Sequence, residues 1–293
     1  MKNKFFILFL SAFLLASCKG EFLDNEGKID NMPYEEMHAL ANNLSEKLIH
    51  TPEKGFENFL SYYTRADVPL KSYLLATLQR TALASDNTYL RQQTTHLMLD
   101  ITRTESEIQF INQALDGLQN FSERDFTSET KVILEKMEIA DSQELIKITG
   151  AANIQSRVKD LQEIATSSSL PKSQWAATLA LARMGDVQKL EEIIQRVKTS
   201  TDIIERSGRL FDELAWTKKQ EAFNVLREYL YSQAYLPSVR DHDKPGTPEA
   251  VYAARAFARH IRNCPPIKHD LPDKQELTDI IYWAKEQKEW QIN

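Results

Sequence analysis

The residue types that could bind a metal ion or carry out acid–base chemistry gather in one stretch, residues 234–272. They are Asp241, His242, Asp243, His260, Cys264 and His269. Three and four residues separate His260, Cys264 and His269, a spacing similar to that of zinc ligands, and a catalytic zinc ion uses three protein ligands. However, two prolines end the expected helix directly after Cys264, so His269 falls on a loop. The alternative is a surface histidine, a buried thiol and a loop histidine. We favour it and expect no metal and no cofactor.

Two motifs typical of hydrolases are absent from the sequence. It contains neither Gly-x-Ser-x-Gly nor His-Glu-x-x-His, and it has no glycine-rich phosphate loop. We therefore expect a protein that is not an enzyme and that has no catalytic residues.

Arginines are the best candidates for binding residues. Arg255, Arg259 and Arg262 are spaced at i, i+4 and i+7 in an expected helix over 248–263, so they would form a basic stripe. Arg240 lies in the charged loop before this helix, and that loop is longer than the other connections. These arginines could bind an acidic partner or a phosphate group. Alternatively, the stripe is solvated or pairs with acidic neighbours, and the loop is an insertion without a role.

The first residues are typical of an export signal. Lys2 and Lys4 make a positive start, and residues 5–16 are apolar except for Ser11. A helix of this length would extend about 18 Å, whereas the hydrocarbon core of a bilayer is about 30 Å thick. The segment therefore predicts a secretory signal rather than a membrane-spanning anchor.

The residues that follow the apolar run are Leu15, Ala16, Ser17 and Cys18. They resemble the lipobox of bacterial lipoproteins, in which a leucine and two small residues precede a cysteine. The resemblance covers this segment only. It implies cleavage before Cys18 and acyl chains on Cys18 that attach the protein to a lipid bilayer.

This resemblance also implies an organisation and a location. Residues 1–17 would be the signal peptide, residues 18–32 a lipidated tether, and residues 33–293 a single helical domain. The residue after Cys18 is Lys19 rather than an aspartate. By similarity to enterobacterial sorting, this predicts the outer membrane, on its periplasmic side or at the cell surface.

The composition excludes one class of partner. Removal of residues 1–17 takes away Lys2 and Lys4, so 34 basic residues remain against 42 acidic ones, a net charge of −8. Nucleic-acid binding depends on neutralising phosphates, so we expect no nucleic-acid partner. With Cys18 lipidated, Cys264 is the one remaining cysteine, and an intramolecular disulfide is impossible.

Between the prolines, the chain is rich in good helix formers and poor in glycine, and it lacks alternating strand patterns. We expect an all-α fold. Beginning with a helix after Pro33, the expected helices cover 53–64, 68–83, 86–102, 105–117, 127–138, 141–149, 153–166, 171–184, 187–199, 202–215, 219–233, 248–263 and 273–289.

A weak repeat indicates how these helices pack. Leu181, Leu190 and Ile193 have the same spacing as Leu214, Phe223 and Leu226, and as Leu99, Ile108 and Ile111. In each set, the chain would turn after the first residue, and the two apolar residues of the second helix would pack against the first helix. The alanine-rich segment 175–186, which ends in Met-Gly-Asp, resembles the first helix and turn of a HEAT repeat. The resemblance implies an irregular α-solenoid of antiparallel helical hairpins; the alternative is a globular helical bundle.

Together these patterns favour a membrane-anchored envelope lipoprotein that acts as a non-enzymatic scaffold for a protein partner. A narrower hypothesis is an immunity protein that neutralises a toxin. Two alternatives stay open: an accessory surface lipoprotein for glycan uptake, and a metal-dependent enzyme centred on His242, His260 and His269.

Overall fold

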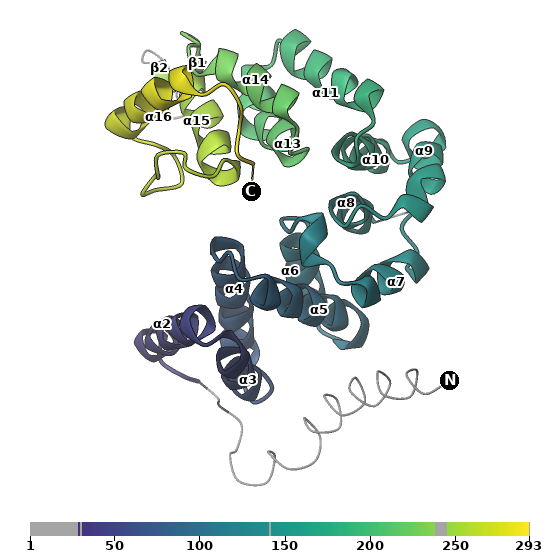
Figure 1. Ribbon diagram of the computed structural model, residues 1–293, viewed down its shortest axis with the longest axis vertical. Helices are drawn as coiled ribbons and strands as arrows, with labels where there is room; N and C mark the ends of the chain where they lie inside the picture. The colour runs from purple at the N-terminus through teal and green to yellow at the C-terminus, as the bar shows by residue number, and fades with distance from the viewer. Residues whose placement is uncertain (1–28, 30, 141, 238–244, 293) are drawn as a thin grey trace. The chain divides into compact units, whose positions relative to one another are not determined.

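The computed structural model describes residues 29, 31–140, 142–237 and 245–292, and the described chain is all-α apart from one short hairpin (Figure 1). This confirms the expected fold class. The chain forms two compact units: the first ends at Leu90 and the second begins at Arg91, inside helix α5 (Thr88–Thr104). The single helical domain predicted for residues 33–293 does not mark this division.

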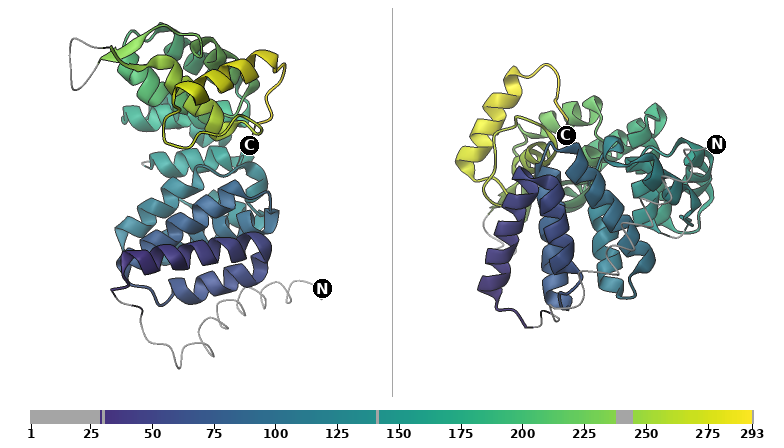
Figure 2. Two further views of the ribbon diagram at one scale, coloured as in Figure 1. Left: turned by 90° about the vertical axis from the view of Figure 1, so that its left-hand side faces the viewer. Right: turned by 60° about the horizontal axis from the view of Figure 1, so that its bottom comes forward.

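The first unit is built from three helices that pack side by side, drawn in purple and dark blue in Figure 2. These are α2 (Tyr34–His50), α3 (Pro52–Tyr63) and α4 (Val68–Ala84). Their core includes Leu48, Phe59 and Leu74, which are fully buried. The apolar positions recur every three to four residues, so each helix presents one stripe to the other two.

The end of the expected tether joins this unit. The backbone of Ile29 donates to Arg65 O (3.0 Å) and accepts from Asp67 N (3.1 Å). Asn31 N also donates to the carboxylate of Asp67 (2.9 Å). Residue 29 is therefore attached to the turn between α3 and α4. Residues 1–28 and 30, which include Cys18, lie outside the described residues.

The second unit contains a longer series of helices. Figure 1 shows that, from α7 to α14, helices that are adjacent in the sequence also lie next to each other in space. Its helices after α5 are α6 (Ile108–Leu118), η1 (Glu123–Asp125), α7 (Ser128–Lys136), α8 (Gln143–Ala151), η2 (Gln155–Arg157), α9 (Val158–Ser167), α10 (Pro171–Met184), α11 (Val187–Thr199), α12 (Ile203–Glu205), η3 (Arg206–Leu210), α13 (Phe211–Trp216), α14 (Gln220–Tyr229), α15 (Glu249–His260) and α16 (Lys274–Glu286).

Helix α10 lies at the centre of this series, packed against α8, α9 and α11. Its small residues permit close packing: a Cβ on Gly150 of α8 would lie 2.6 Å from the Cα of Ala180. The helix ends at Gly185, whose φ of 110° is left-handed. Asp186 then caps α11 by accepting from the backbone of Gln188 and Lys189. The expected bounds of both helices are confirmed.

Two of the three repeat sets point into the core. Leu181, Leu190 and Ile193 are buried, and so are Leu214, Phe223 and Leu226. In the third set Leu99 is buried, but the side chain of Ile108 is 72% exposed. The repeat therefore holds only between α10 and α14, and the HEAT-like solenoid stays a prediction.

The segment before α15 differs from the expected loop. Strands β1 (Tyr235–Pro237) and β2 (Pro245–Pro248) pair in an antiparallel hairpin. The sequence Thr247-Pro248-Glu249 predicts Thr247 as the N-cap of this helix. That prediction is wrong, because Thr247 belongs to β2 and the N-cap position of α15 is Pro248. Residues 238–244, with Arg240 and His242, lie outside the described residues.

The expected helix over 202–215 is interrupted. The segment η3 is a π-helix between two α-helical parts. At its start, Arg206 donates to the buried carboxylate of Glu249 (2.6 Å), which also accepts from Ser232 (2.6 Å). This network connects the π-helix to the first turn of α15.

Candidate functional site

The predicted basic stripe is held by internal ion pairs. Arg255 is buried, and its Nη2 lies 2.7 Å from Oδ2 of Asp212. Arg259 hydrogen-bonds to Asp270 and lies 3.9 Å from Asp212. The helix ends at His260, so Arg262 does not continue the stripe, contrary to the expected helix over 248–263. Arg255 and Arg259 thus pair with acidic neighbours, as the alternative interpretation of the stripe predicts. Partner binding by these residues stays a prediction.

His260, Cys264 and His269, the described histidine and cysteine residues of the same segment, do not gather as metal ligands would. His260 is half-buried, and burial, reinforced by Lys218 and Arg183, lowers its pKa to about 3. Burial raises the pKa of Cys264 to about 12. His269 is exposed on the following loop. Among the described residues, no three histidine, cysteine or carboxylate side chains gather as metal ligands would.

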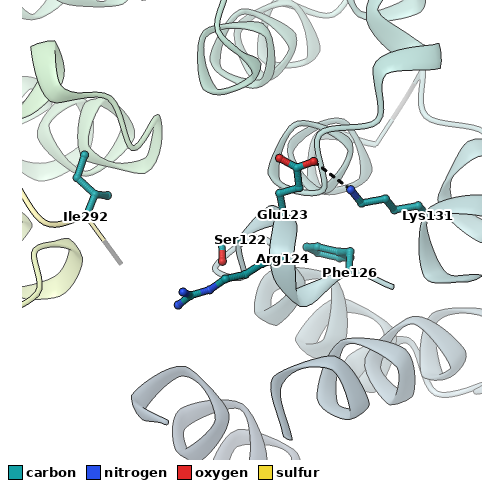
Figure 3. Close-up of a pocket in the computed structure, with 6 residues that line it drawn as sticks. All are labelled: Ser122, Glu123, Arg124, Phe126, Lys131 and Ile292. Atoms are coloured by element: carbon teal, nitrogen blue, oxygen red, sulfur yellow. Dashed lines mark hydrogen bonds and ion pairs between the residues drawn. The ribbon is translucent and has the colours of Figure 1, made fainter. Parts of the chain in front are cut away.

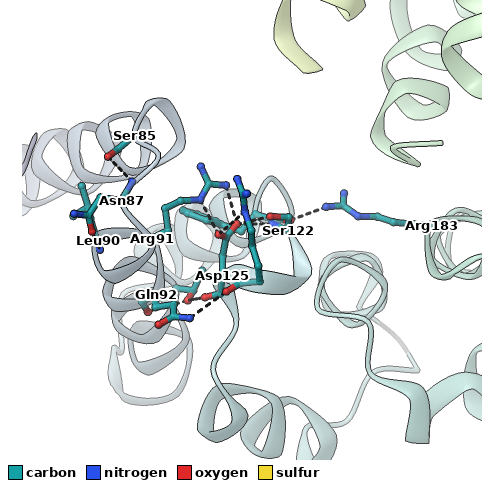
Figure 4. Close-up of polar contacts among 11 residues, drawn as sticks. Ser85, Asn87, Leu90, Arg91, Gln92, Ser122, Asp125 and Arg183 are labelled. Atoms are coloured by element: carbon teal, nitrogen blue, oxygen red, sulfur yellow. Dashed lines mark hydrogen bonds and ion pairs between the residues drawn. The ribbon is translucent and has the colours of Figure 1, made fainter. Parts of the chain in front are cut away.

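A different set of charged residues does converge in the second unit, around Asp125. This carboxylate is fully buried and receives a two-pronged ion pair from Arg91 of α5, with both N–O distances 2.7 Å. It also accepts from the backbone (2.8 Å) and the hydroxyl (2.7 Å) of Ser122 (Figure 4). These contacts join α5 to the short helix η1.

Arg183 reaches the same region from α10, and Figure 4 shows it extending toward Ser122. Its guanidinium donates to Trp216 O (3.0 Å) and Phe121 O (2.6 Å) and lies over the ring of Trp216 at 4.3 Å. Helix α13 ends at Trp216, where carbonyl groups carry the negative end of the helix dipole. Burial lowers the pKa of Arg183 to about 9, so the side chain still carries its charge at neutral pH.

Lys218 occupies the turn between α13 and α14 with a left-handed φ of 55°. Burial lowers its pKa to about 7, and the charges of Arg183, Arg91 and Arg124 add to this shift, whereas Asp125 opposes it. The lysine is thus close enough to the arginines to be repelled by them. We call Arg91, Arg124, Arg183 and Lys218 the cationic cluster.

Arg124 is the exposed member of the cationic cluster. Its side chain is 53% exposed, and its Nε lies 3.8 Å from Oδ1 of Asp125. It lines an open pocket of about 540 Å³, together with Ser122, Phe126, Ile292 and the ion pair between Glu123 and Lys131 (Figure 3). Such an arrangement can bind an anionic group, because a guanidinium presents several N–H donors in one plane.

Sequence reasoning missed this cluster. Its members come from four separate elements, and 127 positions separate Arg91 from Lys218. One local signal was present: Ser122 and Asp125 have the spacing of a capping box, and both of its hydrogen bonds occur at η1. That pattern predicts a helix start but says nothing about the distant cations that meet there.

No protein-family model, curated protein or solved structure matches this chain. In the part of the chain that the structure describes, no helix is both long enough and apolar enough to cross a membrane.

Proposed function

We propose that this protein is a lipid-anchored envelope protein that binds a protein partner without catalysing a reaction, and that the cationic cluster is its contact surface. The carrying observation is that Arg91 and Arg124 lie beside one buried carboxylate, with Arg183 and the partly charged Lys218 near them, in a chain with an acidic net charge. Cations held together in this way repel one another, which is a cost to folding that an anionic partner would relieve.

The side chains around Arg124 are also held in place by hydrogen bonds, which favours binding of a partner. Arg91 and Arg183 are held by hydrogen bonds to groups on other elements, so the charges around Arg124 are fixed before a partner arrives. Preorganised contacts lose less conformational entropy on binding. Helical hairpins stacked as in a HEAT-like solenoid would present this surface rigidly, and lipid chains on Cys18 would hold it at the outer membrane.

The test begins with the tagged lipoprotein in its native host, crosslinked and then purified, with the captured proteins identified by mass spectrometry. We expect one stoichiometric partner, and we expect Arg124→Glu to abolish its capture. The matched control is Arg103→Glu, because Arg103 is 48% exposed on α5 and is not part of the cluster. No partner with the wild type, or equal loss with both variants, would contradict the proposal.

The anchor is tested separately. Cys18→Ser removes the expected acceptor of the acyl chains, so the protein should move from the membrane fraction to the soluble fraction. Fractionation of envelopes with an antibody against the tag measures this change. An unchanged membrane association of the variant would contradict lipid anchoring through Cys18.

A further inference from the structure

We infer that the cationic cluster binds side-chain carboxylates of an acidic, extended segment of the partner, with Arg124 making the direct contact. This inference rests on the proposed function and adds the chemistry of the partner. It depends on how the hydrogen bonds around Asp125 are distributed.

The hydrogen bonds to Asp125 come from Arg91 and Ser122. Oδ1 accepts from Nε of Arg91, and Oδ2 accepts from Nη2 of Arg91 and from the backbone N–H and hydroxyl of Ser122. At 3.8 Å, the Nε of Arg124 lies beyond hydrogen-bond distance from Asp125. The guanidinium of Arg124 therefore borders the pocket without a hydrogen bond to Asp125, and its exposed N–H groups can receive an incoming anion.

The surroundings strengthen the attraction for an anion at this point. Arg183 is buried and Lys218 is half-buried, and charges in such positions are screened less by salt than exposed charges are. An incoming carboxylate could pair with Arg124 through two parallel hydrogen bonds, the strongest geometry available to this pair. The apolar side chains of Phe126 and Ile292 line the same pocket and offer contacts to the aliphatic part of an acidic side chain.

The size and charge of the protein favour a narrow ligand over a broad anionic surface. The chain cleaved before Cys18 would carry a net charge of −8, so its remaining surface would repel a broad anionic surface such as a nucleic acid. A peptide segment bound in the pocket interacts only with nearby charges, because salt screens charges that are more than about 8 Å away at physiological ionic strength. The pocket volume of about 540 Å³ suits a few side chains.

The experiment measures binding of a fluorescent oligoglutamate peptide to the purified full-length lipoprotein in a non-ionic detergent. We expect saturable binding that weakens as salt increases, and no binding of the matching oligoglutamine peptide. Arg124→Glu should weaken binding by more than about tenfold, whereas Arg103→Glu should change it less than about twofold. Arg124→Gln provides a milder second variant, and circular dichroism checks that each variant is folded.

Two competitors distinguish the source of the anion. Inorganic phosphate should compete only weakly, because it offers a single anionic group, and phosphatidylglycerol vesicles should not bind in a manner that depends on Arg124. Strong competition by phosphate, Arg124-dependent vesicle binding, or equal effects of the Arg124 and Arg103 variants would overturn the inference. If Arg124→Glu abolishes capture of the host partner but oligoglutamate does not bind, the acidic-segment inference fails and the proposed function stands.

Discussion

Asp125 holds the cationic cluster together at the scale of single residues. Burial alone would raise its pKa, but the hydrogen bonds from Arg91 and Ser122 outweigh burial and lower the pKa. The residue is therefore charged at neutral pH although it is fully buried. A buried charge is tolerated only where a partner compensates for it, so Arg91 and Asp125 depend on each other.

Replacement of Asp125 by asparagine tests this dependence. Asp125→Asn leaves the charge of Arg91 buried and uncompensated, and we expect the free energy of unfolding to fall by about 3–5 kcal/mol. The control is Asp160→Asn, because the side chain of Asp160 is 46% exposed on α9, where it pairs with Arg157 of η2. That change should cost less than about 1 kcal/mol. Urea denaturation measures the unfolding free energies of both variants. Equal losses would show that the buried ion pair stabilises the fold no more than the pair of Asp160 does.

Lys218 makes the stability of the second unit depend on pH. Its pKa is about 7 in the folded state, below the value of 10.5 for an unperturbed lysine, so the unfolded state binds more protons between these values. Stability should therefore rise from about pH 7 toward pH 10, by at most about 1.4 kcal/mol per unit. The charged groups that face Lys218 are Arg91, Arg124, Asp125 and Arg183, and the titratable imidazole of His260, which is neutral in this pH range, faces it as well.

The variant Lys218→Asn should remove the rise between about pH 7 and pH 9, because asparagine carries no charge and tolerates a left-handed φ. Above about pH 9 Arg183 adds a rise of its own, since its pKa in the folded state is also lowered. Lys198→Asn is the control, since Lys198 is 42% exposed on α11. Denaturation curves at several pH values compare the two variants with the wild type. A rise that persists in Lys218→Asn below the range in which Arg183 acts would assign the pH dependence to other groups.

At the scale of elements, the contact between α8 and α10 depends on Gly150. The backbone of Ala180 lies where a Cβ on Gly150 would stand, at 2.6 Å. Gly150→Ala should force the helices apart and lower the unfolding free energy by about 1–3 kcal/mol. Gly208→Ala is the matched control, since a Cβ there meets no atom within 4 Å. It should be neutral or stabilising, by up to about 1 kcal/mol. A stable Gly150→Ala would mean that the two helices can move apart at little cost.

Helix ends that have local chemical causes could be predicted from the sequence. Helix α10 ends at Gly185 because a left-handed residue suits glycine, and α11 begins after Asp186 because its carboxylate accepts from the first N–H groups. Thr247 carried a similar signal, but pairing of β1 with β2 places it in a strand. A contact between distant segments thus overrode the local preference.

At the scale of the whole second unit, the C-terminal segment closes the packing of α14 and α15. Trp290 is buried against Phe257, with ring centroids 4.9 Å apart, and its indole N–H donates to Asn224 (2.9 Å). Its backbone exchanges two hydrogen bonds with the side chain of Gln220. A residue near the end of the chain is therefore part of the core.

Trp290→Ala should lower the unfolding free energy by about 3–5 kcal/mol. In hydrogen exchange, we expect α14 and α15 to lose protection while α2, α3 and α4 keep theirs, because the first unit has its own core. Tyr282→Ala is the control, since Tyr282 is 66% exposed. Equal loss of protection in both units would contradict independent cores.

The sequence by itself determined the all-α class and most helix positions, because helix periodicity, prolines and capping residues act within a few neighbouring residues. The same local patterns suggested a basic stripe at Arg255, Arg259 and Arg262. Only the tertiary structure decided that Asp212 and Asp270 pair with the first two of these, and that the third lies beyond the helix. It also brought the members of the cationic cluster to one carboxylate. Electrostatic interactions depend on distance in space, and the distance along the chain between Arg91, Asp125 and Lys218 carries no information about it.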